Sequence, residues 1–203
     1  MSRYFVGLDL GQAQDFTALV VLSREDDGYQ LVHAERSRGR PYPNVVRDVV
    51  HLLSREPLAG ASALAVDATG VGAPVVDLFR KAPLKARLVA VSIHGGDKVA
   101  EDASGYRVPK RDLAAVVSVL LQTGRLRIAS ALALAPVLVA ELRNFRVTVN
   151  PATAHESFAA WREADHDDLV LAVALAAWTG EKFSRASLEA VIKTWGRAIS
   201  GRT

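Results

Sequence analysis

The hydrophobic positions form short runs early in the chain and longer, helically spaced patterns in the remainder. Runs rich in β-branched and aromatic residues predict strands, whereas apolar residues at every third or fourth position predict helices. Asp27-Gly28 separates the second run from the third and is typical of a tight turn, so we expect those two strands to pair antiparallel. Strands are predicted at residues 4–10, 17–22, 29–36, 63–66, 87–93 and 126–129.

Helical spacing predicts most of the remaining elements. Pro43 precedes the first helix and Pro57 follows it, at positions where proline commonly marks a helix end. Pro136 is expected to kink or shorten another helix, because proline lacks a backbone N–H. Residues 94–109 indicate a loop or an exposed hairpin, and residues 145–160 are ambiguous, a poor strand being one interpretation. Helices are predicted at residues 44–55, 71–80, 110–122, 132–144, 168–179 and 184–199.

The order of these elements predicts an α/β fold with a mixed central sheet. Three strands form an opening antiparallel meander, and parallel βα units follow it, with helices on both faces of the sheet. This order fits the ribonuclease H-like architecture, whereas a dinucleotide-binding sheet has no opening hairpins. We expect one domain over residues 1–182 and a C-terminal helical tail over residues 183–203.

Composition narrows the class of protein. With 203 residues, 50% of them apolar and 23% charged, the chain can bury a large core, which excludes a disordered or fibrous protein. The absence of cysteine excludes a disulfide scaffold, a thiolate zinc site and a cysteine nucleophile. The longest apolar run, residues 169–178, is well short of the ~18 residues that a membrane span needs. We therefore expect a cytoplasmic protein without a membrane partner, and the net charge of +3 permits a nucleic-acid partner without requiring one.

Carboxylates stand at the ends of apolar elements in three places. Asp9 and Asp67 end two predicted strands, and Asp165, Asp167 and Asp168 precede a helix that is apolar on all sides. The carboxyl ends of strands form the ligand crevice of an open α/β sheet, where gathered carboxylates repel one another unless a divalent cation binds. Oxygen ligands without cysteine favour Mg²⁺ or Mn²⁺ over Zn²⁺. Three or four carboxylates can hold two such ions about 3.5–4 Å apart, an arrangement that hydrolyses phosphodiesters.

Each of these carboxylates also has a purely structural interpretation. An aspartate after a strand is commonly a turn residue, and Asp167 and Asp168 suit a helix cap that complements the helix dipole. The combination of two strand-terminal aspartates with an acidic helix start, in this topological order, favours a joint metal site.

Three segments form an ordered set of motifs: Gly7-Leu8-Asp9-Leu10-Gly11 with Asp15-Phe16-Thr17-Ala18, then Val66-Asp67-Ala68-Thr69-Gly70-Val71-Gly72, then His166-Asp167-Asp168-Leu169-Val170-Leu171-Ala172. Together with the stretch from Val108-Pro109-Lys110 through Glu141-Leu142, they resemble the nuclease domain of phage terminase large subunits over residues 4–180. The resemblance implies a ribonuclease H-like fold and metal-dependent cleavage of double-stranded DNA during genome packaging. It also implies a packaging ATPase, a small terminase or a portal protein as partners, in the cytoplasm of the host cell.

The resemblance also implies roles for individual residues. Asp9 would bridge two metal ions, Asp67 would bind one of them, and Asp168 or Asp167 would bind the other, Asp168 being favoured. Asp15 matches an acidic position of the family and is an auxiliary candidate, with a turn aspartate as the alternative. His166 is a second auxiliary candidate, with a surface histidine as the alternative.

The sequence departs from complete terminase large subunits in one respect. Those proteins carry a packaging ATPase with a phosphate-binding loop, and no GxxxxGK[ST] motif occurs in this sequence. We therefore expect an isolated nuclease domain, the product of a split or remnant prophage gene, or a relative with a different role.

Two clusters of basic residues are candidates for binding DNA phosphates, with solvated surface residues as the alternative. They are Arg36, Arg38 and Arg40 near the end of the third strand, and Lys98, Arg107, Lys110 and Arg111 around the irregular stretch.

Three other functions compete with the terminase nuclease. Gly7-Leu8-Asp9-Leu10-Gly11 also resembles the first phosphate loop of actin-like ATPases, but the chain is too short for their two domains. A nuclease of the Holliday-junction resolvase kind would share the fold and the metals and differ in substrate preference. A non-catalytic assembly module would not need Asp9, Asp67 and Asp168.

Overall fold

The structure is a computed structural model that describes residues 2–12, 15–144 and 167–200, without the side chains of residues 144 and 185–200. The strands are β1 (Tyr4–Asp9), β2 (Phe16–Arg24), β3 (Tyr29–Arg38), β4 (Ser62–Asp67), β5 (Ala86–His94), β6 (Ala100–Asp102), β7 (Gly105–Pro109) and β8 (Leu126–Ile128). The helices are α1 (Tyr42–Leu53), α2 (Gly72–Lys81), α3 (Lys110–Gln122), α4 (Ala135–Asn144) and α5 (Asp168–Ser200).

The described strands form one eight-stranded sheet in the order β6-β7-β5-β4-β1-β2-β3-β8. Strands β1, β2 and β3 pair antiparallel, as the Asp27-Gly28 turn predicts for the last two. Strand β4 follows α1 and pairs parallel to β1, and β5 follows α2 and pairs parallel to β4. Strand β7 pairs parallel to β5. The predicted opening meander followed by parallel βα units is therefore confirmed.

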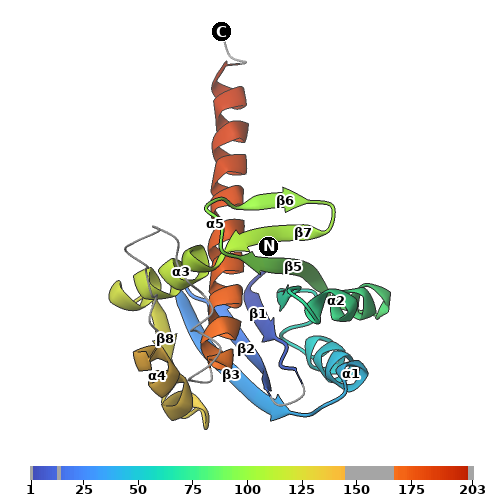
Figure 1. Cartoon of the computed structure of the whole chain (residues 1–203). Coiled ribbons are helices and arrows are strands. Elements are labelled where there is room, and N and C mark those ends of the chain that lie inside the picture. Colours follow the sequence, from blue (N-terminus) through green and yellow to red (C-terminus); the bar gives the residue numbers. More distant parts are fainter. Residues whose placement is uncertain (1, 13–14, 145–166, 201–203) are drawn as a thin grey trace.

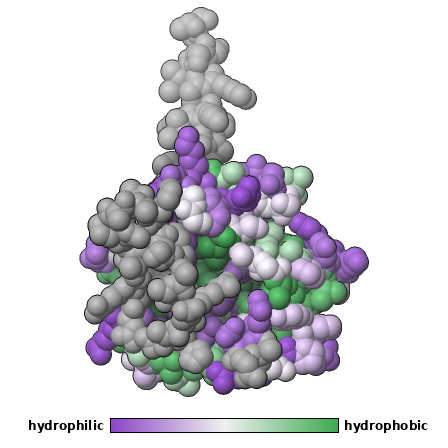
Figure 2. Space-filling view, in the orientation of Figure 1, coloured by the Kyte–Doolittle hydropathy of each residue, from purple (hydrophilic) through white to green (hydrophobic). Residues whose placement is uncertain are grey.

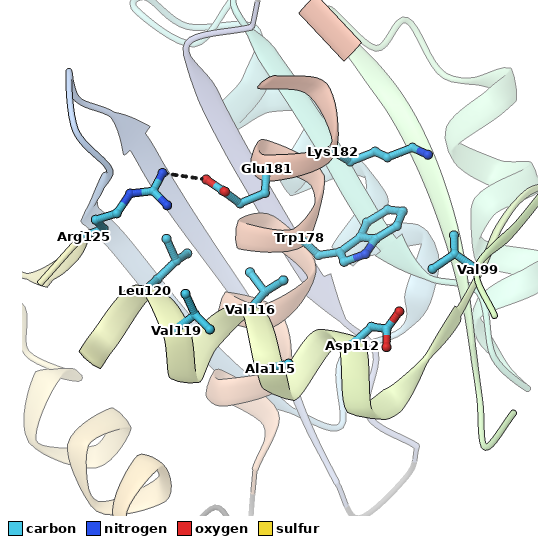
Figure 3. Close-up of a pocket in the computed structure, with 10 residues that line it drawn as sticks. All are labelled: Val99, Asp112, Ala115, Val116, Val119, Leu120, Arg125, Trp178, Glu181 and Lys182. Atoms are coloured by element: carbon cyan, nitrogen blue, oxygen red, sulfur yellow. Dashed lines mark hydrogen bonds and ion pairs between the residues drawn. The ribbon is translucent and has the colours of Figure 1, made fainter. Parts of the chain in front are cut away.

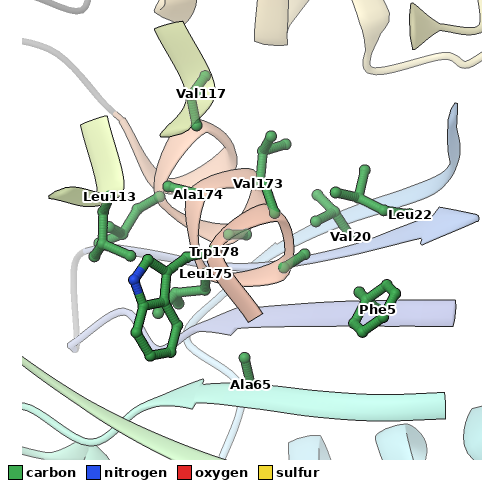
Figure 4. Close-up of a cluster of buried hydrophobic side chains, with 14 of the residues drawn as sticks. Phe5, Val20, Leu22, Ala65, Leu113, Val117, Val173, Ala174, Leu175 and Trp178 are labelled. Atoms are coloured by element: carbon green, nitrogen blue, oxygen red, sulfur yellow. The ribbon is translucent and has the colours of Figure 1, made fainter. Parts of the chain in front are cut away.

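Side chains alternate between two cores, one on each face of the sheet. Val6 and Leu8 pack with α1 and α2 on one face, while Phe5 faces α5 on the other. Figure 1 shows α1 and α2 together on one side of the sheet and α5 crossing the other side, with α3 and α4 beyond it. Figure 4 shows Phe5 and Val20 of the sheet together with Val173 and Leu175 of α5 in the second core.

Helix α5 is the central element of that core. Every residue from 169 to 180 is buried, because the helix lies between the sheet on one side and α3 and α4 on the other. A helix enclosed in this way has no solvent-facing stripe, which explains its apolar sequence on all sides. At Gly7 the helix backbone meets the strand: a Cβ there would lie 1.8 Å from the Ala172 carbonyl oxygen.

The structure corrects the prediction of two separate C-terminal helices. Residues 168–179 and 184–199 belong to the single helix α5, whose C-terminal turns project beyond the sheet (Figure 1). Gly180 does not end the helix; it permits a close contact, since a Cβ there would lie 2.6 Å from the Tyr29 hydroxyl oxygen. The proposed boundary between domain and tail, after residue 182, falls within α5, and that division remains a prediction.

The structure decides between the alternatives that the sequence left open in two regions. Residues 94–109 contain the β6–β7 hairpin, and β7 extends the sheet beside β5. Pro136 is the second residue of α4, so it shortens that helix at its start, where the missing N–H has no partner to lose. Residues 145–160 lie outside the described residues.

Hydrophilic side chains cover much of the visible surface, with apolar patches between them (Figure 2). The exposed apolar side chains include Val119 on α3 and Val99 before β6. None of the helices in the described ranges is long and apolar enough to cross a membrane.

We expect Gly7→Ala to destabilise the fold, because the new methyl group meets helix backbone that cannot rotate away. The expected cost is about 3 kcal/mol, the upper part of the usual range for overpacking. For a chain of this size that corresponds to a melting temperature lower by ~6–12 °C in a thermal melt. Gly96→Ala is the control, because its Cβ would meet only the side chain of His94; equal melting temperatures for the two variants would contradict the close helix–strand contact.

Candidate active site

Asp9 and Asp67 end neighbouring parallel strands in the same register. The last paired residues of β1 and β4 are Leu8 and Val66, so Asp9 and Asp67 are the next on each strand. Adjacent strands lie about 4.8 Å apart, and residues in register share one face of the sheet. Asp9 shares the face of Phe5, and Asp67 pairs with the buried Val91 of the same core. The two carboxylates therefore stand side by side on the α5 face at the carboxyl edge of the sheet.

A positively charged side chain, that of Arg36, lies in the same row of the sheet. Asp9 pairs with Ala18 of β2, and Ala18 pairs with Arg36 of β3, so Arg36 is two strands from Asp9 on the same face. Its side chain is only 12% exposed, and its guanidinium lies 3.9 Å from the centre of the Phe16 ring. The row thus contains two carboxylates, those of Asp67 and Asp9, and one largely buried guanidinium, that of Arg36.

Helix α5 begins at this same edge. Its residue Ala172 lies against Gly7, and farther along the helix the carbonyl of Gly180 accepts a hydrogen bond of 2.9 Å from Arg24, at the opposite end of the sheet. The helix therefore runs antiparallel to β1, which places Asp167 and Asp168 at the edge where β1 and β4 end. The acidic segments singled out in the sequence therefore lie at one edge of the sheet, and their joint role at a metal site stays a prediction.

Asp167 and Asp168 occupy different positions in the first turn of α5. The Asp167 carbonyl accepts a 2.9 Å hydrogen bond from the Leu171 N–H, so Asp167 is the N-cap residue. Asp168 is the first helical residue and is buried, and its Oδ2 accepts a 2.6 Å hydrogen bond from Arg36 Nη2. A charge-assisted bond of this length holds the Asp168 carboxylate against β3.

Glu141 of α4 caps α5 from outside. Its Oε2 accepts hydrogen bonds from the backbone N–H groups of Leu169 at 3.1 Å and Val170 at 3.2 Å, and its Oε1 lies 3.4 Å from Arg36 Nη1. The first N–H groups of a helix have no partner within it, so a carboxylate placed there satisfies them and complements the helix dipole. Burial raises the pKa of the Glu141 carboxyl to about 7, against the opposing effects of Arg36 and of the Val170 N–H.

The sequence-based site did not include Glu141. The one signal available was its spacing: Ala135, Leu138 and Glu141 recur every third residue, and the first two are buried in the core. A carboxylate on the buried side of an apolar helix indicates a specific partner, because an uncompensated charge there is costly.

Among the described residues, no three His, Asp or Glu side chains lie close enough together to hold a metal ion. The ion pair with Arg36 explains why Asp168 is not part of such a group, because it holds the Asp168 carboxylate beside β3. Arg36 is two strand spacings, about 10 Å, from Asp9. The donor set itself suits a hard divalent cation: Asp9, Asp67 and Asp167 provide carboxylate oxygens only. Asp67 is already oriented by the Thr69 N–H, which donates a 2.8 Å hydrogen bond to its Oδ1.

The two auxiliary candidates are placed differently. Asp15 is exposed in the turn that leads into β2, at the same edge of the sheet as Asp9. His166 lies outside the described residues.

The basic candidates fall into two groups. Arg40 forms an ion pair with Asp48, and Arg111 forms one of 2.7 Å with Asp97, so their charges are already neutralised. The others are Arg38, exposed at the end of β3; Lys98, exposed before β6; Arg107, exposed on β7; and Lys110, at the start of α3. Arg38 lies 4.1 Å from the centre of the Phe16 ring, on the face and at the edge of the sheet that carry Asp9.

A pocket of about 430 Å³ lies elsewhere, between α3 and α5. Figure 3 shows Trp178 and Lys182 of α5 facing Val99 and Asp112, with the ion pair of Arg125 and Glu181 at the other end. Glu181 is 13 residues beyond Asp168, which is about 20 Å along a helix. This pocket is therefore separate from the carboxylates at the sheet edge.

Comparison with known proteins agrees with this architecture. The family model described as the terminase RNaseH-like domain matches residues 6–177. The chain belongs to this terminase family. The family and the ribonuclease H-like fold expected from the sequence are thereby confirmed, and the actin-like interpretation is set aside. Among curated proteins, none matches this chain.

Solved terminase nucleases share the fold at low sequence identity. The large terminase nuclease of thermophilic phage G20c is 20% identical with a TM-score of 0.61, covering 85% of this chain and 80% of its own. Its structure with bound magnesium is 22% identical with a TM-score of 0.59, covering 86% and 79%. The human cytomegalovirus terminase nuclease domain, soaked with Mn, is 14% identical with a TM-score of 0.54, covering 86% and 83%. The terminase nucleases therefore share this fold across phage and herpesvirus proteins.

We expect the stability of the protein to depend on the ionisation of Glu141. A carboxyl whose pKa rises from 4.5 to about 7 on folding favours the folded state while protonated. Its contribution is therefore full below pH 4.5 and is lost as the pH rises through 7. Urea unfolding of wild type and Glu141→Gln across this range should show the wild-type free energy of unfolding falling by ~2–3 kcal/mol relative to the variant. A difference that does not change with pH would contradict the raised pKa.

Proposed function

We propose that this chain is a Mg²⁺- or Mn²⁺-dependent endonuclease that cleaves double-stranded DNA during genome packaging. The observation that carries the proposal is the placement of Asp9 and Asp67 in register on neighbouring parallel strands, with the acidic start of α5 at the same edge. Membership of the terminase family supports it. The ATPase, small terminase or portal partners and the host cytoplasm belong to the same proposal.

The surroundings of each acidic residue suggest its role in holding the metal ions. Asp9 would be the ligand shared by two ions, and Asp67, which is oriented by the Thr69 N–H, would bind one of them. Asp167 is a better third ligand than Asp168, because Arg36 already occupies an oxygen of Asp168. Two divalent ions bound there would supply an activated water and stabilise the leaving oxygen of the phosphodiester. No nucleophilic side chain is then required.

DNA would approach along the carboxyl edge of the sheet. Arg38 is the best placed of the basic candidates for a phosphate near the site, because it is exposed beside Arg36 and, within the described residues, pairs with no carboxylate. Stacking on Phe16 limits its rotamers, which lowers the entropy lost on binding.

The carboxylates can be tested by plasmid nicking. We expect wild type to nick supercoiled DNA with Mn²⁺, and chelation by EDTA to stop the reaction. Asp9→Ala and Asp67→Ala should each abolish cleavage while keeping or slightly raising the melting temperature, since removing one carboxylate relieves repulsion. Asp77→Ala is the matched control, because Asp77 is an exposed aspartate of α2 that forms an ion pair with Arg80. Wild-type cleavage by Asp9→Ala would remove the mechanism.

The DNA contact can be tested by binding measurements at several salt concentrations. We expect Arg38→Ala to weaken binding of a short duplex about tenfold and to reduce the salt dependence by about one counterion. Arg40→Ala should have a smaller effect, because Asp48 already neutralises that charge. Equal losses for both variants would argue for a diffuse basic surface instead of a defined contact.

A further inference from the structure

A network of three charged side chains ties together three elements that are distant in sequence. Arg36 of β3 donates to Asp168 of α5 at 2.6 Å and lies 3.4 Å from Glu141 of α4. All three side chains are largely buried, with exposed fractions of 12%, 10% and 6%. Glu141 is bonded in turn to the backbone of the first turn of α5.

We propose that Glu141 and Arg36 are positioning residues for the metal site, which together fix the first turn of α5 and therefore Asp167. This inference rests on the proposed function. The positioning role does not require either side chain to touch a metal ion: Oε2 of Glu141 accepts the two backbone N–H groups, and Oε1, which accepts no hydrogen bond among the described residues, is ion-paired with Arg36 at 3.4 Å.

Helix geometry explains why the first turn needs such support. The N–H groups of Leu169 and Val170 have no partner within α5, and Asp167 follows directly from residues outside the described part of the chain. With Glu141 in place, both groups are bonded to a side chain of the neighbouring helix α4. Without it, the first turn is free to fray, and the Asp167 carboxylate moves with it.

Arg36 contributes a second restraint from the sheet. It belongs to the same strand row as Asp9 and Asp67, so its bond to Asp168 sets the start of α5 relative to those two aspartates. It also neutralises Asp168, which lowers the repulsion among the acidic groups at this edge. The planar guanidinium reaches both Asp168 and Glu141, as a single ammonium group cannot.

The test compares direct Mn²⁺ binding, followed by electron paramagnetic resonance of MnCl₂ titrations without DNA at pH 8, in wild type and Glu141→Gln. The amide keeps the size of the side chain and loses its charge. We expect the dissociation constant for Mn²⁺ to rise ~10–100-fold, the usual effect of removing a group that orients a ligand. Hydrogen exchange of the Leu169 and Val170 amides, measured without metal, should accelerate.

Glu181→Gln is the matched control. Glu181 lies on the same helix and binds Arg125 at 3.0 Å and the Tyr29 hydroxyl at 3.1 Å, but it is far from Asp167. This variant should bind Mn²⁺ as wild type does. Arg36→Lys is the second variant, expected to bind Mn²⁺ more weakly than wild type, and it carries the test if Glu141→Gln does not fold.

The outcomes separate the two proposals. Unchanged Mn²⁺ affinity in Glu141→Gln, or in Arg36→Lys where that variant carries the test, overturns the positioning role and leaves the nuclease proposal intact. Equal losses in Glu141→Gln and Glu181→Gln reduce the effect to general stability and also overturn it. A wild-type protein that neither binds Mn²⁺ nor cleaves DNA refutes the proposed function, and the positioning role falls with it.

Discussion

The contact between the backbone of α5 and that of β1 is the constraint on which the rest of the structure depends. Gly7 leaves no room for a side chain between strand and helix, so the helix rests directly on the sheet. This close contact fixes the distance between α5 and the sheet and limits the direction in which the helix can run. Because the helix runs antiparallel to β1, its acidic start comes to the edge where Asp9 and Asp67 end their strands. A helix seated farther from the sheet would lie too far from those aspartates for its own acids to join them.

This packing has an electrostatic consequence. Because α5 begins in the core, Asp168 is buried, and so is Glu141, which binds the first turn of the helix. A buried carboxylate without a partner is strongly destabilising, and Arg36 compensates for both at once. Buried ion pairs contribute little net stability compared with apolar residues of the same size. What the network does contribute is geometry: it defines where the first turn of α5 sits relative to the sheet.

The features that could be predicted from the sequence are those that depend on neighbouring residues, such as strand periodicity and turn residues. Strand periodicity located β1 and β4, so their terminal aspartates could be assigned to one edge of the sheet. Two features that depend on contacts between distant residues were missed. The continuity of α5 past Gly180 depends on its contact with Tyr29, and a glycine within a helical pattern otherwise indicates a possible end. The cap by Glu141 joins residues 28 positions apart, and the spacing of Glu141 with Ala135 and Leu138 indicates that it is buried but not which groups it binds.

The acidic edge is stabilised by contacts with other groups of the protein. Asp67 accepts the Thr69 N–H, Asp168 is paired with Arg36, and the N-terminus of α5 offers its dipole to the neighbouring acids. Each interaction lowers the cost of placing a negative charge at this edge. These contacts offset part of the electrostatic cost of the acidic edge within the protein itself, whereas in some small domains a metal ion supplies the folding energy. A divalent cation bound at this edge would offset the remaining repulsion by drawing the other carboxylates, Asp9 among them, toward a shared positive charge.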